Sequence, residues 1–304
     1  MRDRKLIINA ALTGIVPSKE QTPFVPITPE EIASDAKRVY DLGASMVHIH
    51  ARDENGAHTA DKEVYREIIL RIREKCEDVI ITVSTSGRRT KNLHERLQVI
   101  ELDGDAKPDM ASLTLGSLNF MHDVSVTHPH DIRCMLETII ASGLKPELEV
   151  FDTGMANFAA HLFNKGLIQG PQYMNLLLGS LGTMPATPKD LFHLVGSLPE
   201  QCIWAATGVG KFAFQTQCLS IAAGGHVRVG IEDGIYMNGN KELATNAKLT
   251  ERVRRVAEAM ERPIMSAKEL RAILFPRPSG DAGHIDGEPF EKQIAPRIHQ
   301  LRRA

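Results

Sequence analysis

The chain has 304 residues, 42% of them hydrophobic, and a formal net charge of −2 at pH 7. This length fits one large α/β domain or two small ones, and the near-neutral charge argues against a surface that binds nucleic acid. Four scattered cysteines without CxxC spacing predict reduced thiols, not a disulfide framework. Because neither a secretion signal nor a membrane-spanning segment is evident, we expect a soluble cytoplasmic protein.

Short apolar runs alternate with longer amphipathic stretches along the chain. Eight runs have the length and composition of strands, over residues 6–11, 45–50, 79–85, 110–115, 147–151, 173–178, 202–206 and 227–231. Helical periodicity follows most of them, over 29–42, 62–73, 129–142, 155–165, 188–195 and 215–223. Thr28, Pro29 and Glu31 have the pattern of a helix start, with a capping threonine and a carboxylate at the third helical position.

This order of elements predicts the fold. Units of about 30 residues, each a strand and then a helix, require parallel strands because a helical crossover joins one strand to the next. A closed (β/α)8 TIM barrel fits the count and the length, and a doubly wound open sheet is the structural alternative. Two more helices, over 241–260 and 266–274, are predicted after the last strand.

The composition changes from Pro276 onward. Proline, glycine and serine over 276–281 are typical of a linker. Residues 290–304 predict a basic helix. We therefore expect a barrel catalytic domain over residues 1–275 and a C-terminal helical extension over 276–304, which is a candidate oligomer arm.

The second predicted strand carries two histidines. Because residues i and i+2 of a strand point to the same side, His48 and His50 project together and can grip one cation. Glu232, at the end of the last predicted strand, adds a carboxylate, with Asp233 beside it. A barrel places its site at these strand ends, so two histidines and one carboxylate predict an open, catalytic metal site. A purely structural role for the histidine pair is the alternative.

Other polar side chains lie near the ends of neighbouring strands. Ser84 is near the end of the third predicted strand, Ser112 and Thr114 belong to the fourth, and Glu149 belongs to the fifth. A carboxylate that faces a barrel interior needs a cationic or hydrogen-bonding partner. Arg228, on the last predicted strand, is the candidate partner of Glu149, either within an active site or as a structural ion pair.

Seven collinear segments between residues 5 and 275 stand out: AALTG (10–14), PITPEEI (26–32), VHIHAR (47–52), VST (83–85), LNF (118–120), PELEV (146–150) and GGHVRVGIED (224–233). Together they resemble one family, the zinc-dependent β-keto acid cleavage enzymes. The last segment is the most specific. The resemblance implies a (β/α)8 barrel in a homo-oligomer, with a tetramer favoured. It also implies a reaction, in which a β-keto acid and acetyl-CoA give acetoacetate and a new acyl-CoA.

The resemblance also implies roles for the residues at the strand ends. It makes His48, His50 and Glu232 the ligands of Zn²⁺, although this ligand set by itself also suits Mn²⁺, Co²⁺ or Fe²⁺. Asp233 becomes the base that removes a proton from the carbon between the ketone and the carboxylate. The resemblance also implies that Arg228 and Glu149 support Asp233.

Substrate contacts follow from the same resemblance. Ser84 and Gly87 are expected to seat the substrate carboxylate. Ser112 stands where the family often has threonine, which keeps the hydroxyl, and Thr114 stands where the typical member has asparagine.

One position departs from the family pattern. The typical member has a glutamate that meets a substrate ammonium group, and this chain has Val16 there. We therefore predict a neutral or apolar β-keto acid as the substrate and not a cationic one. Arg88 and Arg89 favour either a second substrate carboxylate or the CoA phosphates, unless they face solvent.

Three other functions compete with this one. A hydrolase of the amidohydrolase type also uses two histidines on a barrel strand, but on the first strand and with more histidines on the fifth and sixth. A metal-dependent aldolase is chemically closer and needs no CoA. A barrel that only binds a ligand, as a regulator or scaffold, is the alternative without catalysis.

Overall fold

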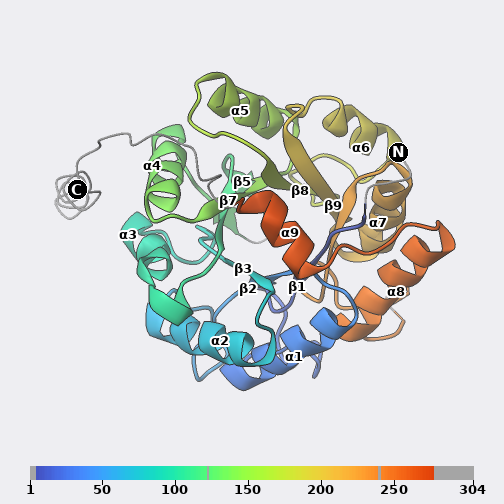
Figure 1. The fold of residues 1–304 in the computed structure, drawn as a ribbon, viewed down its shortest axis with the longest axis horizontal. Coiled ribbons are helices and arrows are strands. Elements are labelled where there is room, and N and C mark those ends of the chain that lie inside the picture. The colour runs from blue at the N-terminus through green and yellow to red at the C-terminus, as the bar shows by residue number, and fades with distance from the viewer. Residues whose placement is uncertain (1–4, 122, 239–240, 277–304) are drawn as a thin grey trace.

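A computed structural model describes residues 5–121, 123–238 and 241–276 and shows a closed barrel of parallel strands (Figure 1). The barrel strands are β1 (Ile8–Ala11), β2 (Met46–Ile49), β3 (Ile80–Val83), β4 (Met110–Thr114), β7 (Lys145–Val150), β8 (Gln172–Leu178), β9 (Cys202–Gly208) and β10 (His226–Val229). The barrel closes because β1 pairs with both β2 and β10. The predicted (β/α)8 barrel is confirmed, and the open-sheet alternative is wrong.

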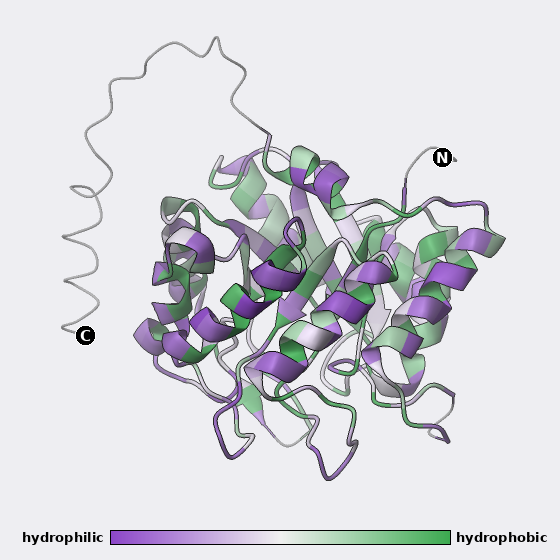
Figure 2. Cartoon of the chain, turned by 60° about the horizontal axis from the view of Figure 1, so that its bottom comes forward, coloured by the Kyte–Doolittle hydropathy of each residue, from purple (hydrophilic) through white to green (hydrophobic). Residues whose placement is uncertain are grey.

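Helices lie around the sides of the barrel and over one of its ends. The helices are α1 (Pro29–Asp41), α2 (Lys62–Lys75), α3 (Leu93–Leu97), α4 (Pro129–Ala141), α5 (Thr153–Asn164), α6 (Pro188–Val195), α7 (Ala213–Ala222), α8 (Asn246–Ala259) and α9 (Ala267–Leu274). Figure 2 shows hydrophilic and hydrophobic residues alternating along these outer helices, as expected where one face of a helix packs on the sheet. Thr28 and Glu31 form the predicted capping box at the start of α1.

The last barrel strand is shorter than the sequence predicts. It ends at Val229, so Glu232 and Asp233 lie on a turn beyond β10 instead of at the end of a strand over 227–231. Gly230 begins that turn with φ 157°, and a Cβ there would meet the carbonyl oxygen of Ala11 at 1.9 Å. The strand therefore stops where the chain presses against the backbone of β1, a contact that only glycine allows.

Other differences lie between the regular units. The segment between β3 and β4 contains the short α3 and two 3₁₀ helices, η1 (Gln98–Glu101) and η2 (Gly104–Ala106), which the periodicity does not predict. A hairpin of β5 (Leu118–Asn119) and β6 (Val124–Ser125) was also not predicted, because two-residue strands have no periodicity to read. α8 begins after its capping residue Thr245, later than the expected start at 241.

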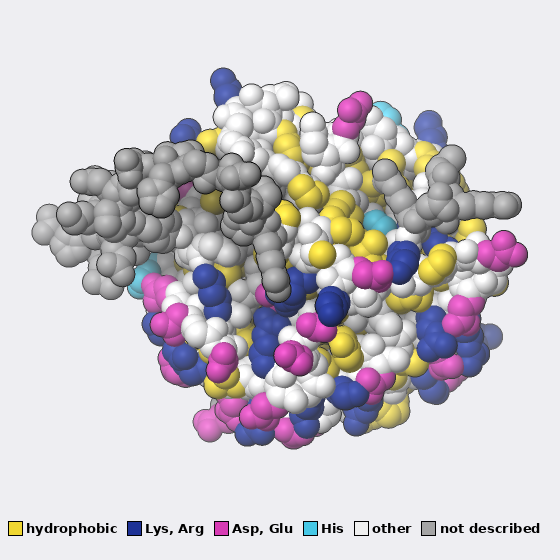
Figure 3. All heavy atoms as spheres, in the orientation of Figure 1, with side chains coloured by type: hydrophobic (Ala, Val, Ile, Leu, Met, Phe, Trp, Pro, Cys, Tyr) yellow, Lys and Arg dark blue, Asp and Glu magenta, His cyan; other side chains and the backbone are white. Residues whose placement is uncertain are grey.

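α9 covers one end of the barrel. Leu270 and Leu274 pack against Ile7, Met46, Ile80, Met110, Tyr173 and Ala205, which lie on six different strands or at their beginnings. Figure 1 shows α9 across the centre of the ring, so the view looks onto the end where the strands begin. Figure 3 shows acidic and basic side chains interspersed over the same face, with no large area of one sign.

The predicted C-terminal extension lies, apart from Pro276, outside the described residues. The division at residue 275 and the oligomer arm therefore stay predictions. In the described ranges, no helix combines the length and the apolar character that crossing a membrane requires.

Candidate active site

The register of three adjacent strands brings the distant segments together. β1 lies between β10 and β2, with Ala10 paired to Val229 and Ala11 paired to His48. The end of β2 and the turn after β10 therefore meet over the end of β1. Both are at the C-terminal end of the barrel, where (β/α)8 enzymes place their active sites.

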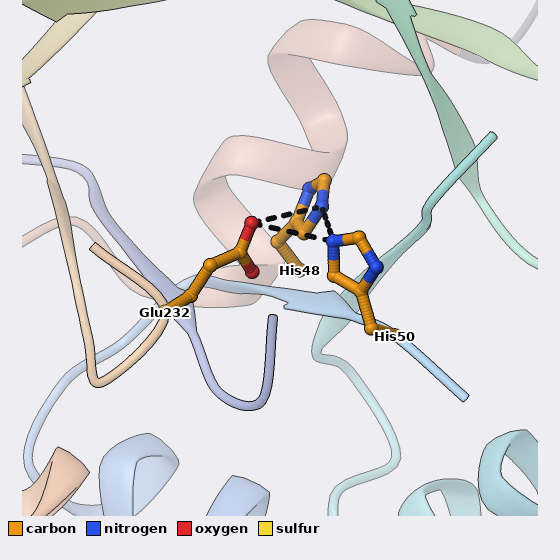
Figure 4. A group of neighbouring side chains, drawn as sticks. All are labelled: His48, His50 and Glu232. Atoms are coloured by element: carbon orange, nitrogen blue, oxygen red, sulfur yellow. Dashed lines mark hydrogen bonds and ion pairs between the residues drawn. The ribbon is translucent and has the colours of Figure 1, made fainter. Parts of the chain in front are cut away.

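His48, His50 and Glu232 form one cluster (Figure 4). The two Nε2 atoms of the histidines are 3.4 Å apart, and Glu232 Oε1 lies 3.3 Å from His50 Nε2 and 4.0 Å from His48 Nε2. Gly14, with φ 67°, makes room for this carboxylate, because a Cβ there would lie 2.6 Å from Glu232 Cγ. The three side chains that the sequence assigns to one site are neighbours in the structure.

The cluster fits a metal ion by its donors and its spacing. Two ligand atoms bound at the usual Zn–N distance in a tetrahedron are separated by about 3.3 Å, close to two of the three separations in the cluster. His50 Nδ1 and Glu232 Oε2 are buried without a hydrogen-bond partner among the described residues. Burial lowers the pKa of His50, which favours the neutral imidazole that a metal requires. Two nitrogens and one carboxylate oxygen suit several divalent metals.

Arg228 lies among three carboxylates beside this cluster. Its Nη2 is 2.6 Å from Glu232 Oε1, and its Nε is 3.0 Å from Asp233 Oδ2. Its Nη1 lies 3.7 Å from Glu149 Oε1. Because the arginine side chain is only 1% exposed, its charge acts on all three carboxylates with little screening by water. The predicted pairing of Arg228 with Glu149 is present, and the arginine also binds the two acidic residues on the turn.

The two adjacent carboxylates respond to Arg228 differently. Burial alone would raise the pKa of Glu232, but Arg228 and the two histidines outweigh burial and hold that pKa well below its usual value. Burial and the neighbouring Glu232 charge raise the pKa of Asp233, against the opposing effect of Arg228. Ionising both buried carboxylates around one guanidinium is unfavourable, so Glu232 is the more acidic of the two and Asp233 binds a proton more readily.

A cavity of about 590 Å³ opens beside Glu232 and Asp233. Much of its wall is apolar and comes from the C-terminal end of the barrel, from the end of β8, from β5 and from loops. These side chains include Ile15, Val16, Leu118, Phe120, Leu177 and Leu181. The polar part of the wall contains Ser84, Thr114 and Glu149, all expected from sequence. A mainly apolar cavity with a few convergent polar groups is the usual form of a small-molecule site.

The comparison with protein families shows which family the chain belongs to. A family model described as beta-keto acid cleavage enzyme matches residues 5–275. The chain belongs to this family. The resemblance read from the seven sequence segments is therefore confirmed.

The matches between this chain and its curated relatives cover nearly the whole length of each relative. This chain is 43% identical over 271 residues to the 3-keto-5-aminohexanoate cleavage enzyme of Fusobacterium nucleatum, a match that covers 89% of this chain and 97% of that protein. This chain is 32% identical over 294 residues to the 3-dehydrocarnitine:acetyl-CoA trimethylamine transferase of Rhizobium meliloti, a match that covers 90% of this chain and 97% of that protein. It is 30% identical over 271 residues to the 3-oxoadipate:acetyl-CoA acetyltransferase of Cupriavidus necator, covering 88% and 94%.

A solved structure supports the fold. The apo structure of ObcA superposes with a TM-score of 0.74 at 19% identity, over 82% of this chain. This chain spans 65% of the length of that chain. At this identity the likeness shows a shared barrel and nothing more.

The loop after β3 carries two of the residues expected at the substrate, Ser84 and Gly87, and a third, Ser112, lies on β4 next to this loop. Ser84 lies on the cavity wall, and its Oγ accepts a hydrogen bond from Ser86 N–H at 3.2 Å. Ser112 lies behind it, and its Oγ accepts from Thr85 N–H at 3.1 Å. Gly87 is also behind the wall, where a Cβ would lie 2.9 Å from an Nη atom of Arg96. In this family member, Ser112 and Gly87 therefore shape the loop that presents Ser84.

Arg96 is a buried cation beneath that loop. Its Nε donates to Thr85 O at 2.9 Å, and burial lowers the pKa of its guanidinium to about 10. No ion pair to Arg96 exists within the described ranges, and Asp131 acts on it only at longer range. A positive charge without a close counter-ion favours an anion on the loop above it.

Three further arginines lie at or near the cavity rim. Arg88 lies on the wall, with its guanidinium 4.1 Å from the centroid of the Phe120 ring and its Nε 3.2 Å from Asp123. Arg89 Nη2 lies 3.3 Å from the same carboxylate, that of Asp123, and the Arg89 side chain is 57% exposed. Arg52 donates to the carbonyls of Gly14 and Pro17, and so anchors the loop that carries Val16.

Glu149 and Glu147 project from the same side of β7, but only Glu149 was singled out in the sequence. Glu149 accepts a hydrogen bond from Thr114 Oγ1 at 2.7 Å. Glu147 lies deeper in the barrel, fully buried, with Oε2 2.7 Å from Nδ1 of His48. The alternation of carboxylates over residues 147–149 is the sequence signal that identifies it, since residues i and i+2 share a face.

Proposed function

We propose that this protein condenses a β-keto acid with acetyl-CoA and cleaves the adduct to acetoacetate and a new acyl-CoA. Membership of the beta-keto acid cleavage enzyme family supports the reaction, and two relatives are named for transfers that involve acetyl-CoA. The observation that carries the proposal is the His48, His50 and Glu232 cluster next to Asp233 at one cavity. The aldolase and hydrolase alternatives do not require acetyl-CoA.

His48, His50 and Glu232 are the proposed ligands of a Zn²⁺ ion, which when bound supplies a Lewis acid for the ketone oxygen of the substrate. The distances that join His48 Nε2, His50 Nε2 and Glu232 Oε1 support this assignment.

Asp233 is the proposed base. It lies on the cavity wall and is held by Arg228, and Glu149 binds the same guanidinium from the other side. Asp233 takes a proton from the carbon between ketone and carboxylate, and that carbon forms a bond to the acetyl carbon as CoA leaves as its thiolate. The thiolate then attacks the original ketone carbon. The carbon–carbon bond breaks, and Asp233 returns the proton to the acetoacetate carbanion.

The cavity supports a substrate without a positive charge. Val16 and its apolar neighbours offer no carboxylate to an ammonium group on the distal part of a substrate. Asp123 already pairs with Arg88 and Arg89, so these arginines carry only one net charge between them for a second substrate anion. The Ser84 loop, above Arg96, is the proposed seat of the substrate carboxylate. We infer a neutral β-keto acid with an apolar distal group.

A coupled assay tests the proposed function. Metal-replete protein is given a panel of neutral, dicarboxylic and cationic β-keto acids, each with and without acetyl-CoA, and acetoacetate is measured. We expect turnover that requires acetyl-CoA, is fastest with the neutral acids and is lost in H48A. Turnover without acetyl-CoA would instead identify an aldolase or hydrolase.

A further inference from the structure

We propose that Glu147 is a positioning residue for the metal site. It orients the His48 ring so that Nε2 points toward His50 and Glu232. It also holds the proton on Nδ1, so that Nε2 is free to bind a metal. This inference rests on the metal site of the proposed function, and it assigns a role to a carboxylate that touches neither the cavity nor the expected ligand atoms.

The contacts of His48 place its two ring nitrogens in different surroundings. Nδ1 lies 2.7 Å from Glu147 Oε2, while Nε2 lies 3.4 Å from His50 Nε2 at the other edge of the ring. A carboxylate on one nitrogen keeps the proton there, which leaves the lone pair on the other nitrogen free for a metal. The ring is 1% exposed, so no water competes with Glu147 for this hydrogen bond.

The second oxygen of Glu147 is held from two sides. Nδ2 of Asn9, from β1, and Nδ2 of Asn175, from β8, each donate to Glu147 Oε1 at 2.6 Å. Both amides turn their nitrogen to the carboxylate, although their own Oδ1 atoms are then buried without a partner among the described residues. Two amide donors on one oxygen and His48 on the other fix the orientation of the Glu147 carboxylate.

The two carboxylates of β7 therefore have separate tasks. Glu149 faces the cavity and binds Arg228 and Thr114, two groups that are not ligands of the cluster. Glu147, two residues earlier, is fully buried and contacts a ligand directly. Their difference in position provides a matched pair of variants on a single strand.

The test compares E147Q with E149Q by measuring Zn²⁺ affinity in competition with a chromogenic chelator. Loss of such a supporting carboxylate weakens metal binding by roughly 10- to 100-fold, and we expect this for E147Q. For E149Q we expect a change of less than about twofold, because Glu149 touches no ligand of the cluster. Unchanged Zn²⁺ affinity in a folded E147Q would overturn the proposal, while the acetyl-CoA dependence of the wild type would still stand.

A measurement on the wild type keeps the test valid if E147Q does not fold. Nitrogen-15 NMR of histidine-labelled, Zn²⁺-loaded protein reports which ring nitrogen of His48 carries a proton. We expect the proton on Nδ1, with a chemical shift that marks a strong hydrogen bond. A metal-bound or unprotonated Nδ1 would contradict the role assigned to Glu147. N175A, which removes one donor to Glu147, should weaken Zn²⁺ binding by roughly 2- to 10-fold, the effect of one hydrogen bond.

Discussion

At the scale of single residues, one stereochemical rule accounts for most of the site. Side chains two apart on a strand share a face, and this rule predicts the pairing of His48 with His50. The same rule applies to β7, where Glu147 supports a ligand and Glu149 faces the cavity. The sequence alone does not reveal which partner each of the two inward carboxylates reaches, since that depends on how far along the barrel axis each one lies.

The first prediction concerns Val16, which lies on the cavity wall and is 52% exposed. V16E places a carboxylate where the family pattern has one. An exposed ion pair contributes up to about 1 kcal/mol, so the kcat/KM for a cationic β-keto acid relative to a neutral one should rise roughly 3- to 5-fold. V16Q has the same shape without the charge and should leave the ratio unchanged. A wild-type preference for the cationic acid would refute this account of specificity.

At the scale of elements, local sequence predicts where helices start better than where strands stop. The capping box of Thr28 and Glu31 lies within four residues, so α1 is predictable from sequence alone. The end of β10 depends on contact between Gly230 and the backbone of β1, about 220 residues away in sequence. The contacts that attach α9 to the barrel are also long-range, such as the ion pair of Arg271 with Asp109, which lie 162 residues apart.

The second prediction concerns the ion-pair cluster that attaches α9. Asp109 accepts from Arg73 Nη2 at 2.6 Å and from Arg271 Nη2, on α9, at 3.0 Å. Because hydrogen bonds to charged groups are among the stronger ones, D109N should lower the free energy of unfolding by about 2 kcal/mol. E258Q removes the exposed ion pair between Arg254 and Glu258 on α8, and it should change the free energy of unfolding by less than about 0.5 kcal/mol. Equal effects of the two variants, measured by chemical denaturation, would show that the cluster contributes nothing.

The same carboxylate gives the expected pH dependence. Burial alone would raise the pKa of Asp109, but the hydrogen bond from Arg271 and the charges of Arg73 and Arg271 outweigh burial and lower the pKa. A carboxyl whose pKa is lower in the folded state stabilises the protein above its unfolded pKa of about 3.9 and loses that contribution as the pH falls through the folded pKa. The difference in stability between wild type and D109N should therefore shrink below about pH 4.

At the scale of the whole molecule, the barrel separates stability from chemistry. α9 and its apolar contacts close the end where the strands begin. The cavity, the three candidate ligands and Asp233 lie at the other end. This division is typical of (β/α)8 enzymes, in which residues at the opposite end of the barrel contribute to stability.

The third prediction follows from this separation. Leu270 is fully buried on α9, so L270A should lower the free energy of unfolding by about 2–5 kcal/mol through lost burial and a cavity. The kcat/KM per folded molecule should stay within about twofold, because the substitution lies at the opposite end of the barrel. I273A, at a position that is 40% exposed on the same helix, should cost less than about 0.5 kcal/mol. A large loss of kcat/KM in folded L270A would show that the two ends are coupled.

The sequence by itself determined the alternation of strands and helices, the start of α1, the two histidines, the acidic pair and the family. These features depend on strand and helix periodicity, on capping within a few residues, or on short motifs, all of which are local. The tertiary structure alone decided that β10 stops at Val229, that Arg228 binds three carboxylates, that Ser112 and Gly87 lie behind the cavity wall, and that Glu147 supports His48. Each of these depends on closure of the barrel, which brings together side chains from strands far apart in the sequence and sets the depth at which each one lies.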